Sequence, residues 1–344
     1  MSKIPTDLSL VASVGLDLAK HVFHVHAADA DGKVILSKAL RRQKLAAFFA
    51  SLPPCTVGME ACGSAHYWGR ELEAQGHTVK LIPPIYVKPF VRRQKNDANY
   101  AAAIHEALFR PGLRFVPIRS VASQAALMRH KTREMLIGQR TQLLNGLRSH
   151  LSEVGIIAGQ GPQHTRALAA LIRDGEPTIP DPVRMSLMPL VTQLAHIDEA
   201  LNTIDAEIAR AAGAHPVASR LMTIPGIGRI TADAIAATIE DPSQFGGPRE
   251  FAAFLGLVPR QHSSGGKARL GRISRMGNGY LRKLLFVGAH AVLRFQAKHE
   301  DPLRTWARKL LGTKPPNVVA VALANKLARM AFALMRDNSR YAAA

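Results

Sequence analysis

The sequence predicts an N-terminal α/β part followed by an all-α remainder. Three observations lead to this expectation. Short apolar or alternating segments separated by turn residues fill the first 117 residues, long segments with helical spacing fill the middle, and helices with glycine-rich turns follow from about residue 220. With 344 residues, 47% of them hydrophobic, the chain is long enough for two or three domains with their own cores. The expected domains are 1–117, 118–215 and 216–344.

The N-terminal part begins with three strands and then alternates. Residues 29–32, Asp-Ala-Asp-Gly, predict a hairpin turn between the second and third strands. Asp97 can cap a last helix, because an alanine-rich run follows it. A three-stranded meander followed by alternating helices and strands is the order of a ribonuclease-H-like domain. In chain order we expect strands at 10–19, 21–29 and 33–40, a helix at 44–52, a strand at 55–60, a helix at 64–76 and a strand at 77–84.

The middle is expected to hold two long helices joined by a loop over 155–182. The first covers residues 121–155. The second has apolar residues at alternating spacings of three and four, a heptad seam: Leu187, Leu190, Leu194, Ile197, Leu201, Ile204 and Ile208. Two interpretations stay open, a hairpin of the two helices or a dimerising coiled coil. Pro189 weakens only the first turn of the second helix.

A Pro-Gly-Ile-Gly turn opens the helical C-terminal part. The segment 221–239, LMTIPGIGRITADAIAATI, has a helix-hairpin-helix pattern. Gly226 and Gly228 let backbone N–H groups face a phosphate at a helix start. A plain αα-hairpin would use the same residues.

Charge is distributed unevenly. The chain has 45 Lys and Arg against 25 Asp and Glu, a net charge of +20, and from Leu255 to Ala344 there are 17 basic and 3 acidic residues. A clustered excess of this kind favours a nucleic-acid partner over a solubility role. Two cysteines, Cys55 and Cys62, form neither a zinc half-site nor a disulfide framework. No signal peptide and no membrane span are recognisable, so a cytoplasmic protein is expected.

Three acids stand where a ribonuclease-H-like fold gathers carboxylates. Asp17 ends the first strand, Glu60 ends the fourth, and Asp97 opens a late helix. A carboxylate at the end of an apolar strand is costly unless it is paired or metal-bound, and Mg²⁺ prefers such hard oxygen ligands. Taken singly, each acid is equally an ordinary strand-end or capping residue. Taken together, they predict a Mg²⁺ site.

A second constellation lies in residues 262–285, HSSGGKARLGRISRMGNGYLRKLL. Ser263 and Ser264 precede paired glycines, which let a backbone approach a phosphate. A serine nucleophile needs cations or a metal to stabilise charge developing on that phosphate. The residue types alone also fit a mobile basic loop with incidental serines. The candidate phosphate-binding cations are Lys267, Arg269, Arg272 and Arg275.

Five motifs, taken in order, resemble the IS one-ten family of insertion-sequence transposases, in particular its eleven-eleven subgroup. They are GLDLAKHVFHVHA, GMEACGSAHYWGREL, KNDANYAAAIHEA, IPGIGRITADAI and FLGLVPRQHSSGGKARLGRISRMGNGYLRKLL, and the likeness runs over nearly the whole chain. The resemblance implies a RuvC-like domain with a DEDD carboxylate set, a coiled-coil middle and a C-terminal transposase domain with a nucleophilic serine. It also implies a recombinase that acts on donor and target DNA as a dimer or tetramer, guided by a structured bridge RNA.

By the resemblance, Asp17, Glu60 and Asp97 are the first three carboxylates, and Ser264 is the nucleophile, with Ser263 as the alternative register. The fourth carboxylate position holds Tyr100. Tyrosine is neutral near pH 7 and a poor magnesium ligand, so we expect slow or absent cleavage. Two rival functions remain: a metal-only nuclease of the Holliday-junction type, and a catalytically inactive nucleic-acid-binding relative.

Overall fold

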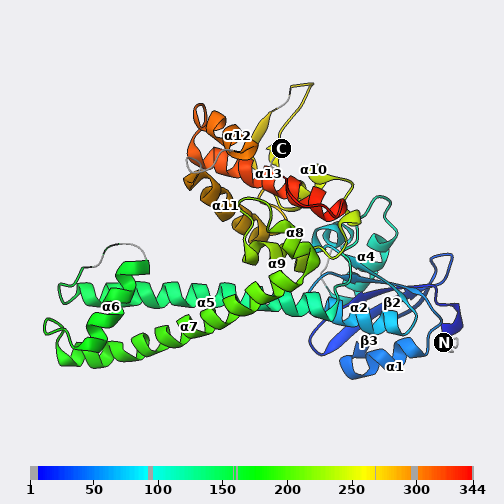
Figure 1. Ribbon diagram of the computed structural model, residues 1–344. Coiled ribbons are helices and arrows are strands. Elements are labelled where there is room, and N and C mark those ends of the chain that lie inside the picture. Colours follow the sequence, from blue (N-terminus) through cyan, green and yellow to red (C-terminus); the bar gives the residue numbers. More distant parts are fainter. Residues whose placement is uncertain are drawn as a thin grey trace. The chain divides into compact units, whose positions relative to one another are not determined.

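The computed structural model describes residues 7–91, 96–157, 159, 162–267, 269–295 and 301–342, except the side chains of residues 162–166. The chain forms two compact units, residues 1–120 and 121–344 (Figure 1). Both cysteines are free thiols. Short 3₁₀ segments lie at Leu8–Leu10, Arg42–Lys44, Lys88–Phe90 and Pro242–Gln244.

The first unit is built on a five-stranded sheet with the order β3-β2-β1-β4-β5. The first three strands form an antiparallel meander, and β4 and β5 continue parallel to β1. All five predicted strands are confirmed, each with slightly shorter or shifted bounds: β1 Ser13–Asp17, β2 Val22–Ala28, β3 Val34–Arg41, β4 Thr56–Glu60 and β5 Thr78–Ile82.

Helices cover both faces of this sheet. α1 (Leu45–Ala50) and α2 (Ala65–Ala74) pack on one face, where alternate residues of the strands are fully buried. Each large apolar side chain buried there contributes about 1.5–3 kcal/mol. The short helix α3 (Pro84–Val87) precedes α4 (Asp97–Leu108), and α4 lies across β1 and β2 on the other face.

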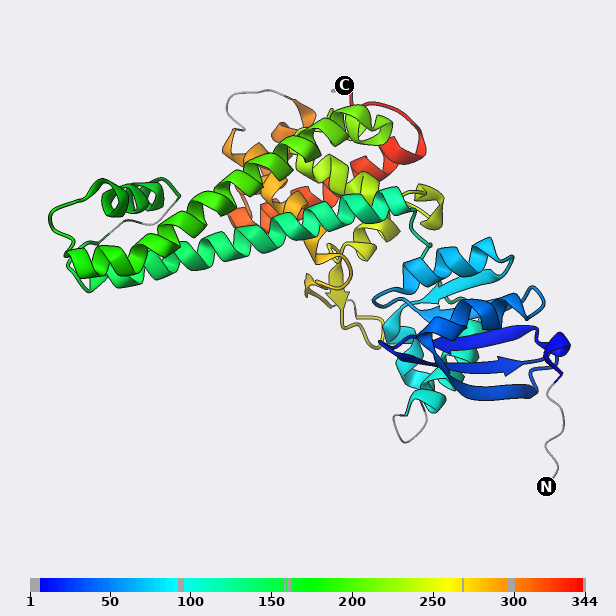
Figure 2. The same cartoon turned by 90° about the horizontal axis from the view of Figure 1, so that it is seen from below.

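The second unit begins with a long antiparallel helix hairpin. α5 (Val121–Ser152) and α7 (Asp181–Ala214) lie side by side in both Figure 1 and Figure 2. Ion pairs join Arg133 to Asp205 and Arg140 to Asp198 along the hairpin. Most of the predicted heptad seam is buried within the chain, so the seam residues are used by the hairpin. A dimerising coiled coil stays a prediction.

The expected loop over 155–182 is wrong in one respect, because it contains helix α6 (Pro162–Asp174). Leu168, Ala169 and Ile172 of α6 are buried against Leu147 and Leu194 at the tip of the hairpin. The apolar residues of this short helix have helical spacing, which the expectation of a loop overlooked, and its apolar face completes a small core there.

The rest of the second unit is a helical core with one small hairpin. The hairpin consists of β6 (Pro259–Gln261) and β7 (Leu270–Ile273). α13 (Pro316–Arg336) is apolar and long enough to resemble a membrane span, but 56% of its most apolar 18-residue window is buried inside the structure, and the helix belongs to the core. The helices are α8 Pro216–Leu221, α9 Arg229–Thr238, α10 Pro248–Phe254, α11 Gly279–Arg294, α12 Pro302–Leu311 and α13 Pro316–Arg336.

Candidate active site

Strand register brings Asp17 and Glu60 to one edge of the sheet. β1 and β4 are parallel neighbours, and Leu16 pairs with Met59, so the acid that follows each of them lies at the same edge. Helix α4 comes close to this face because Gly15 has no side chain: a Cβ there would lie 2.3 Å from the carbonyl oxygen of Ala101. The first turn of α4, with Asp97, belongs to the same face.

Tyr100 occupies the space beside Glu60. Its hydroxyl donates a hydrogen bond to Glu60 Oε2. Burial, this hydrogen bond and the negative charge of Glu60 all raise the pKa of Tyr100. The phenol of Tyr100 is therefore neutral and donates a hydrogen bond to the Glu60 carboxylate. An aspartate at this position would instead be able to act as a metal ligand.

Asp97 lies more openly than the other two acids. Its side chain is 67% exposed, and Oδ2 is 3.8 Å from Nδ1 of His24, which sits opposite Asp17 in the β1–β2 ladder. The expected capping role of Asp97 is wrong: Asn96 is the cap, and its side chain accepts from the Asn99 N–H at 2.7 Å. Within the described residues, no three His, Cys, Asp or Glu side chains gather closely enough to hold a metal as they stand.

Sequence reasoning missed His24. The available signal was the alternation of β2, which places His24 and His26 on the face that α4 covers, while Phe23 and Val25 are buried on the other. His24 lies on that face opposite Asp17, so it is a neighbour of the candidate acids.

The two candidate serines have different surroundings in the β6–β7 loop. Ser263 Oγ accepts hydrogen bonds from Gln261 Nε2 at 2.9 Å and from the Arg269 backbone N–H at 3.1 Å. Ser264 lies at the exposed turn, where its carbonyl accepts from Lys267 N at 3.1 Å. Among the described residues, nothing hydrogen-bonds to the Ser264 hydroxyl. Ser263 therefore shapes the loop, and Ser264 presents its hydroxyl to solvent.

The base of this loop is closed by two glycines and an arginine. A Cβ at Gly256 would lie 2.1 Å from Met276 O, and one at Gly277 would lie 1.9 Å from Phe254 O. Arg282 Nη1 donates to the carbonyls of Leu255 at 2.8 Å and Met276 at 3.1 Å. Sequence reasoning did not single out Arg282. The base is thus closely packed, while Gly265 and Gly266 at the tip have open space around them.

Of the four predicted cations, two lie in this loop, Arg272 lies on β7 and Arg275 follows that strand. Lys267, Arg269, Arg272 and Arg275 are all exposed, and Arg275 has a positive φ of 55°. Arginine and lysine in such positions are free to meet phosphate oxygens. The arrangement can hold a nucleic-acid backbone near the Ser264 hydroxyl.

The Pro-Gly-Ile-Gly turn borders a groove of about 1060 Å³ between α5, α7, α9 and α11. Gly226 is required by packing, since a Cβ there would lie 2.8 Å from Gly288 O of α11. Gly228 is the N-cap of α9, and a Cβ there would meet nothing within 4 Å. The two glycines thus differ: Gly226 serves the fold, and Gly228 leaves the helix start open.

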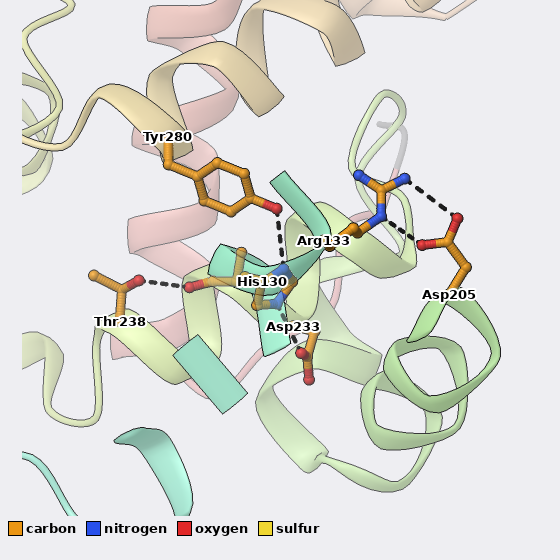
Figure 3. Close-up of polar contacts among 7 residues, drawn as sticks. His130, Arg133, Asp205, Asp233, Thr238 and Tyr280 are labelled. Atoms are coloured by element: carbon orange, nitrogen blue, oxygen red, sulfur yellow. Dashed lines mark hydrogen bonds and ion pairs between the residues drawn. The ribbon is translucent and has the colours of Figure 1, made fainter. Parts of the chain in front are cut away.

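A buried polar network fixes the helices around this turn (Figure 3). His130 Nε2 of α5 lies 2.9 Å from Asp233 Oδ2 of α9, and His130 Nδ1 lies 3.1 Å from the Tyr280 hydroxyl of α11. Arg133 pairs with Asp205 of α7, and this hydrogen bond raises the pKa of the guanidinium. The N-terminal half of α5 is thereby tied to the helix that follows Gly228.

Two family models match the chain. Residues 14–156 match the DEDD transposase model of the IS110 group, and residues 218–304 match the model described as the IS116/IS110/IS902 transposase family.

Three relatives are similar over nearly the whole chain. A probable family 20 transposase of Pseudomonas aeruginosa is 45% identical, covering 96% of this chain and 98% of the relative. The transposase of IS1328 from Yersinia enterocolitica is 38% identical over 96% of this chain and 98% of its own length. That of IS1111A from Coxiella burnetii is 38% identical over 95% and 90%. The chain belongs to the IS116/IS110/IS902 family of transposases, enzymes of DNA transposition.

Proposed function

We propose that this transposase cleaves and rejoins DNA through a covalent serine intermediate, with Ser264 as the nucleophile. The observation that supports the proposal best is the contrast between the two serines: Ser263 is engaged by the loop, and Ser264 is exposed at its tip, in a segment of the chain that also carries four exposed cations. Such a loop can approach a DNA backbone with its exposed tip while its closely packed base stays in place.

The proposed step is a transfer of a phosphodiester. Ser264 Oγ forms a bond to phosphorus, the bond from phosphorus to the 3′ oxygen breaks, and the serine proton is lost while the 3′ oxygen is protonated. The resulting 5′-phosphoserine link preserves the bond energy for rejoining. Lys267, Arg269, Arg272 and Arg275 are proposed to stabilise the charge on the phosphate.

The acid edge of the first unit is proposed to be the metal site of a ribonuclease-H-like, RuvC-like domain, an assignment that the strand order supports. Carboxylate oxygens suit Mg²⁺, and Asp17, Glu60 and Asp97 would hold one ion once their side chains converge from the more open arrangement described above. Tyr100 does not supply the extra acid of a two-ion site. When bound, Mg²⁺ would polarise the scissile phosphate. Tyr100 holds one oxygen of Glu60, and this hydrogen bond has to open before Glu60 can serve as a ligand.

The nucleic-acid partners and the oligomeric state are part of the same proposal. The two helices flanking Gly226 and Gly228 form a helix-hairpin-helix that holds a DNA phosphate at the start of α9. A structured bridge RNA selects target and donor DNA, so the protein itself reads mostly shape and backbone. The enzyme works in the cytoplasm as a dimer or tetramer. Because the α5–α7 hairpin buries most of its own heptad seam, a coiled-coil contact between copies would use the remaining faces of the hairpin.

The serine is tested with Ser264→Ala and the matched control Ser263→Ala, both supplied with the RNA of the element and both DNA substrates. We expect a covalent protein–DNA adduct on a denaturing gel for the unchanged protein and for Ser263→Ala, and none for Ser264→Ala. Cleavage that persists in Ser264→Ala would instead favour a metal-only nuclease.

The hydrogen bond from Tyr100 to Glu60 favours a second possibility, a weakly active or inactive relative. Tyr100→Asp tests it, with Tyr100→Phe as the control that removes the hydroxyl but adds no ligand. We expect recombination to rise with aspartate and to change less with phenylalanine. Equal activity of Tyr100→Asp and the unchanged protein would refute the assigned role of Tyr100.

A further inference from the structure

A surface groove of the second unit is lined by none of the residues of the serine loop or of the Pro-Gly-Ile-Gly turn. It runs over one stripe of α13, between α12 and the start of α10, and has two connected parts of about 510 Å³ and 420 Å³ that share Pro248 and Arg329. These volumes lie in the range of pockets that hold small planar groups. The function derived so far makes no use of this groove.

The floor of the groove explains why it is hollow. The stripe of α13 that faces it repeats at helical spacing and includes the small residues Ala322 and Ala333. The opposite side of α13 is fully buried in the core, so the helix cannot turn to fill the space. Asn325 Nδ2 donates to the Leu257 carbonyl at 3.1 Å and fixes the centre of the stripe.

One wall is an aromatic ring with a cation over it. Trp306 of α12 is half-buried, and Lys326 Nζ of α13 lies 4.4 Å from its ring centroid. A cation on a flexible stem can leave the ring face for a phosphate while a base takes its place. The sequence contains only two tryptophans, and the other, Trp68, is buried in the first unit.

The far end of the groove is also basic. Arg329 joins the two parts of the groove, and Arg249 lines the second. The acid found there, Glu250, accepts a hydrogen bond from the Gly246 N–H at 2.8 Å, which occupies part of its carboxylate. Three cations, Lys326, Arg329 and Arg249, stand against this one carboxylate, so the lining has a net positive charge that is complementary to a phosphate chain.

From these observations we propose that the α12–α13 groove binds single-stranded nucleic acid, with one base stacked on Trp306 and the neighbouring phosphates on Lys326 and Arg329. An aromatic platform beside a track of cations is the usual means of holding a single strand without reading its sequence. The strand is either RNA or unpaired DNA, which share this chemistry. The inference extends the proposed RNA-guided function but does not depend on the serine chemistry.

The test uses full-length protein with Trp68→Phe, so that Trp306 is the only tryptophan. It is titrated with eight-nucleotide oligo-dT, with oligo-U of the same length and with polyglutamate, while anisotropy of the labelled oligonucleotide measures affinity. We expect saturable quenching of Trp306 by the oligonucleotides. Tighter binding of oligo-U would identify the guide RNA as the source, and tighter binding of oligo-dT an unpaired DNA strand; either supports the proposal.

Variants separate stacking from charge. Trp306→Ala should weaken binding roughly 5- to 150-fold, the equivalent of losing one stacked base, while Trp306→Phe retains most of the affinity. Arg329→Ala should lower the slope of log K against log salt by about 0.7, since one phosphate contact is lost. Lys314→Ala, an exposed cation that does not line the groove, should leave both values nearly unchanged.

Three results would overturn the proposal. The first is oligonucleotide binding without quenching of Trp306, and the second is an unchanged affinity in a folded Trp306→Ala protein, with folding checked by circular dichroism. The third is quenching by polyglutamate equal to that by the oligonucleotides, which would mean that the groove holds acidic peptides. Because adduct formation by Ser264 is measured separately, failure here is distinct from failure of the serine mechanism.

Discussion

Replacing His130 with alanine should strongly destabilise the second unit. His130 is 2% exposed and Asp233 is 7% exposed in their side chains, and the two groups are 2.9 Å apart. The Nε2 atom facing the carboxylate has to carry a proton, so His130→Ala removes the donor and leaves a buried carboxylate without it. Breaking a buried pair from one side costs about 3–5 kcal/mol. The hydrogen bond to the Tyr280 hydroxyl, worth about 1 kcal/mol, is lost as well.

The assay is urea unfolding of full-length protein that carries Trp68→Phe, so that the fluorescence of Trp306 reports on the second unit. His130→Ala is compared with Asp233→Ala, with the double variant and with His196→Ala, an exposed histidine of α7. The control should change the free energy of unfolding by less than about 0.5 kcal/mol. The double variant should lose at least about 1 kcal/mol less than the two single losses combined, because both remove one interaction. A loss below about 1 kcal/mol for His130→Ala, or full additivity, would refute the reasoning.

Three further predictions concern glycines and pH. Gly288→Ala should destabilise the second unit by about 1–3 kcal/mol, because the added Cβ would lie 2.0 Å from Gly226 O. Gly213→Ala, which adds its Cβ in open space, should instead stabilise α7 by up to about 1 kcal/mol. Urea unfolding midpoints should therefore fall for Gly288→Ala and rise for Gly213→Ala, and equal midpoints would contradict the packing argument. Gly228→Ala should leave the thermal unfolding midpoint of the protein unchanged but weaken DNA binding in anisotropy titrations, whereas Gly226→Ala should lower the unfolding midpoint. A lower midpoint for Gly228→Ala and an unchanged one for Gly226→Ala would contradict the roles assigned to the two residues. Burial and a neighbouring histidine lower the pKa of His105 to about 4. The unfolded chain therefore binds more protons than the folded one between about pH 6.5 and pH 4. The stability of the first unit should fall as the pH falls through this range, and less so in His105→Gln; urea midpoints that do not vary with pH would contradict this.

Much of the first unit could be predicted from local patterns. Alternation and turn residues located every strand, and the ends of β1 and β4 identified Asp17 and Glu60 as neighbours, because parallel strands share an edge. Local patterns are sufficient there since strand periodicity records which face is buried. The capping residue was misplaced by one position, from Asn96 to Asp97, which is the usual uncertainty of a helix start.

The second unit was harder, because its specific contacts join distant parts of the chain. His130 and Asp233 are 103 residues apart, and nothing in either segment marks the other as its partner. Helix α6 was missed although its apolar residues have helical spacing, and the residues that it packs against at the hairpin tip lie in other segments of the chain. The difference between Ser263 and Ser264 also depends on contacts, with Gln261 and Arg269, that residue types alone cannot assign.

The α5–α7 hairpin has two separate hydrophobic cores. One lies at the tip, around Leu147, Leu151 and Ile172, and the other belongs to the helical body at the opposite end. α5 has 32 residues and so extends about 48 Å. Between the two cores, the ion pairs Arg133–Asp205 and Arg140–Asp198 join it to α7. Amide hydrogen exchange should therefore resolve two opening free energies, a lower one for the tip and a higher one for the body. The tip can then open and close as a cooperative unit of its own while the body keeps its fold.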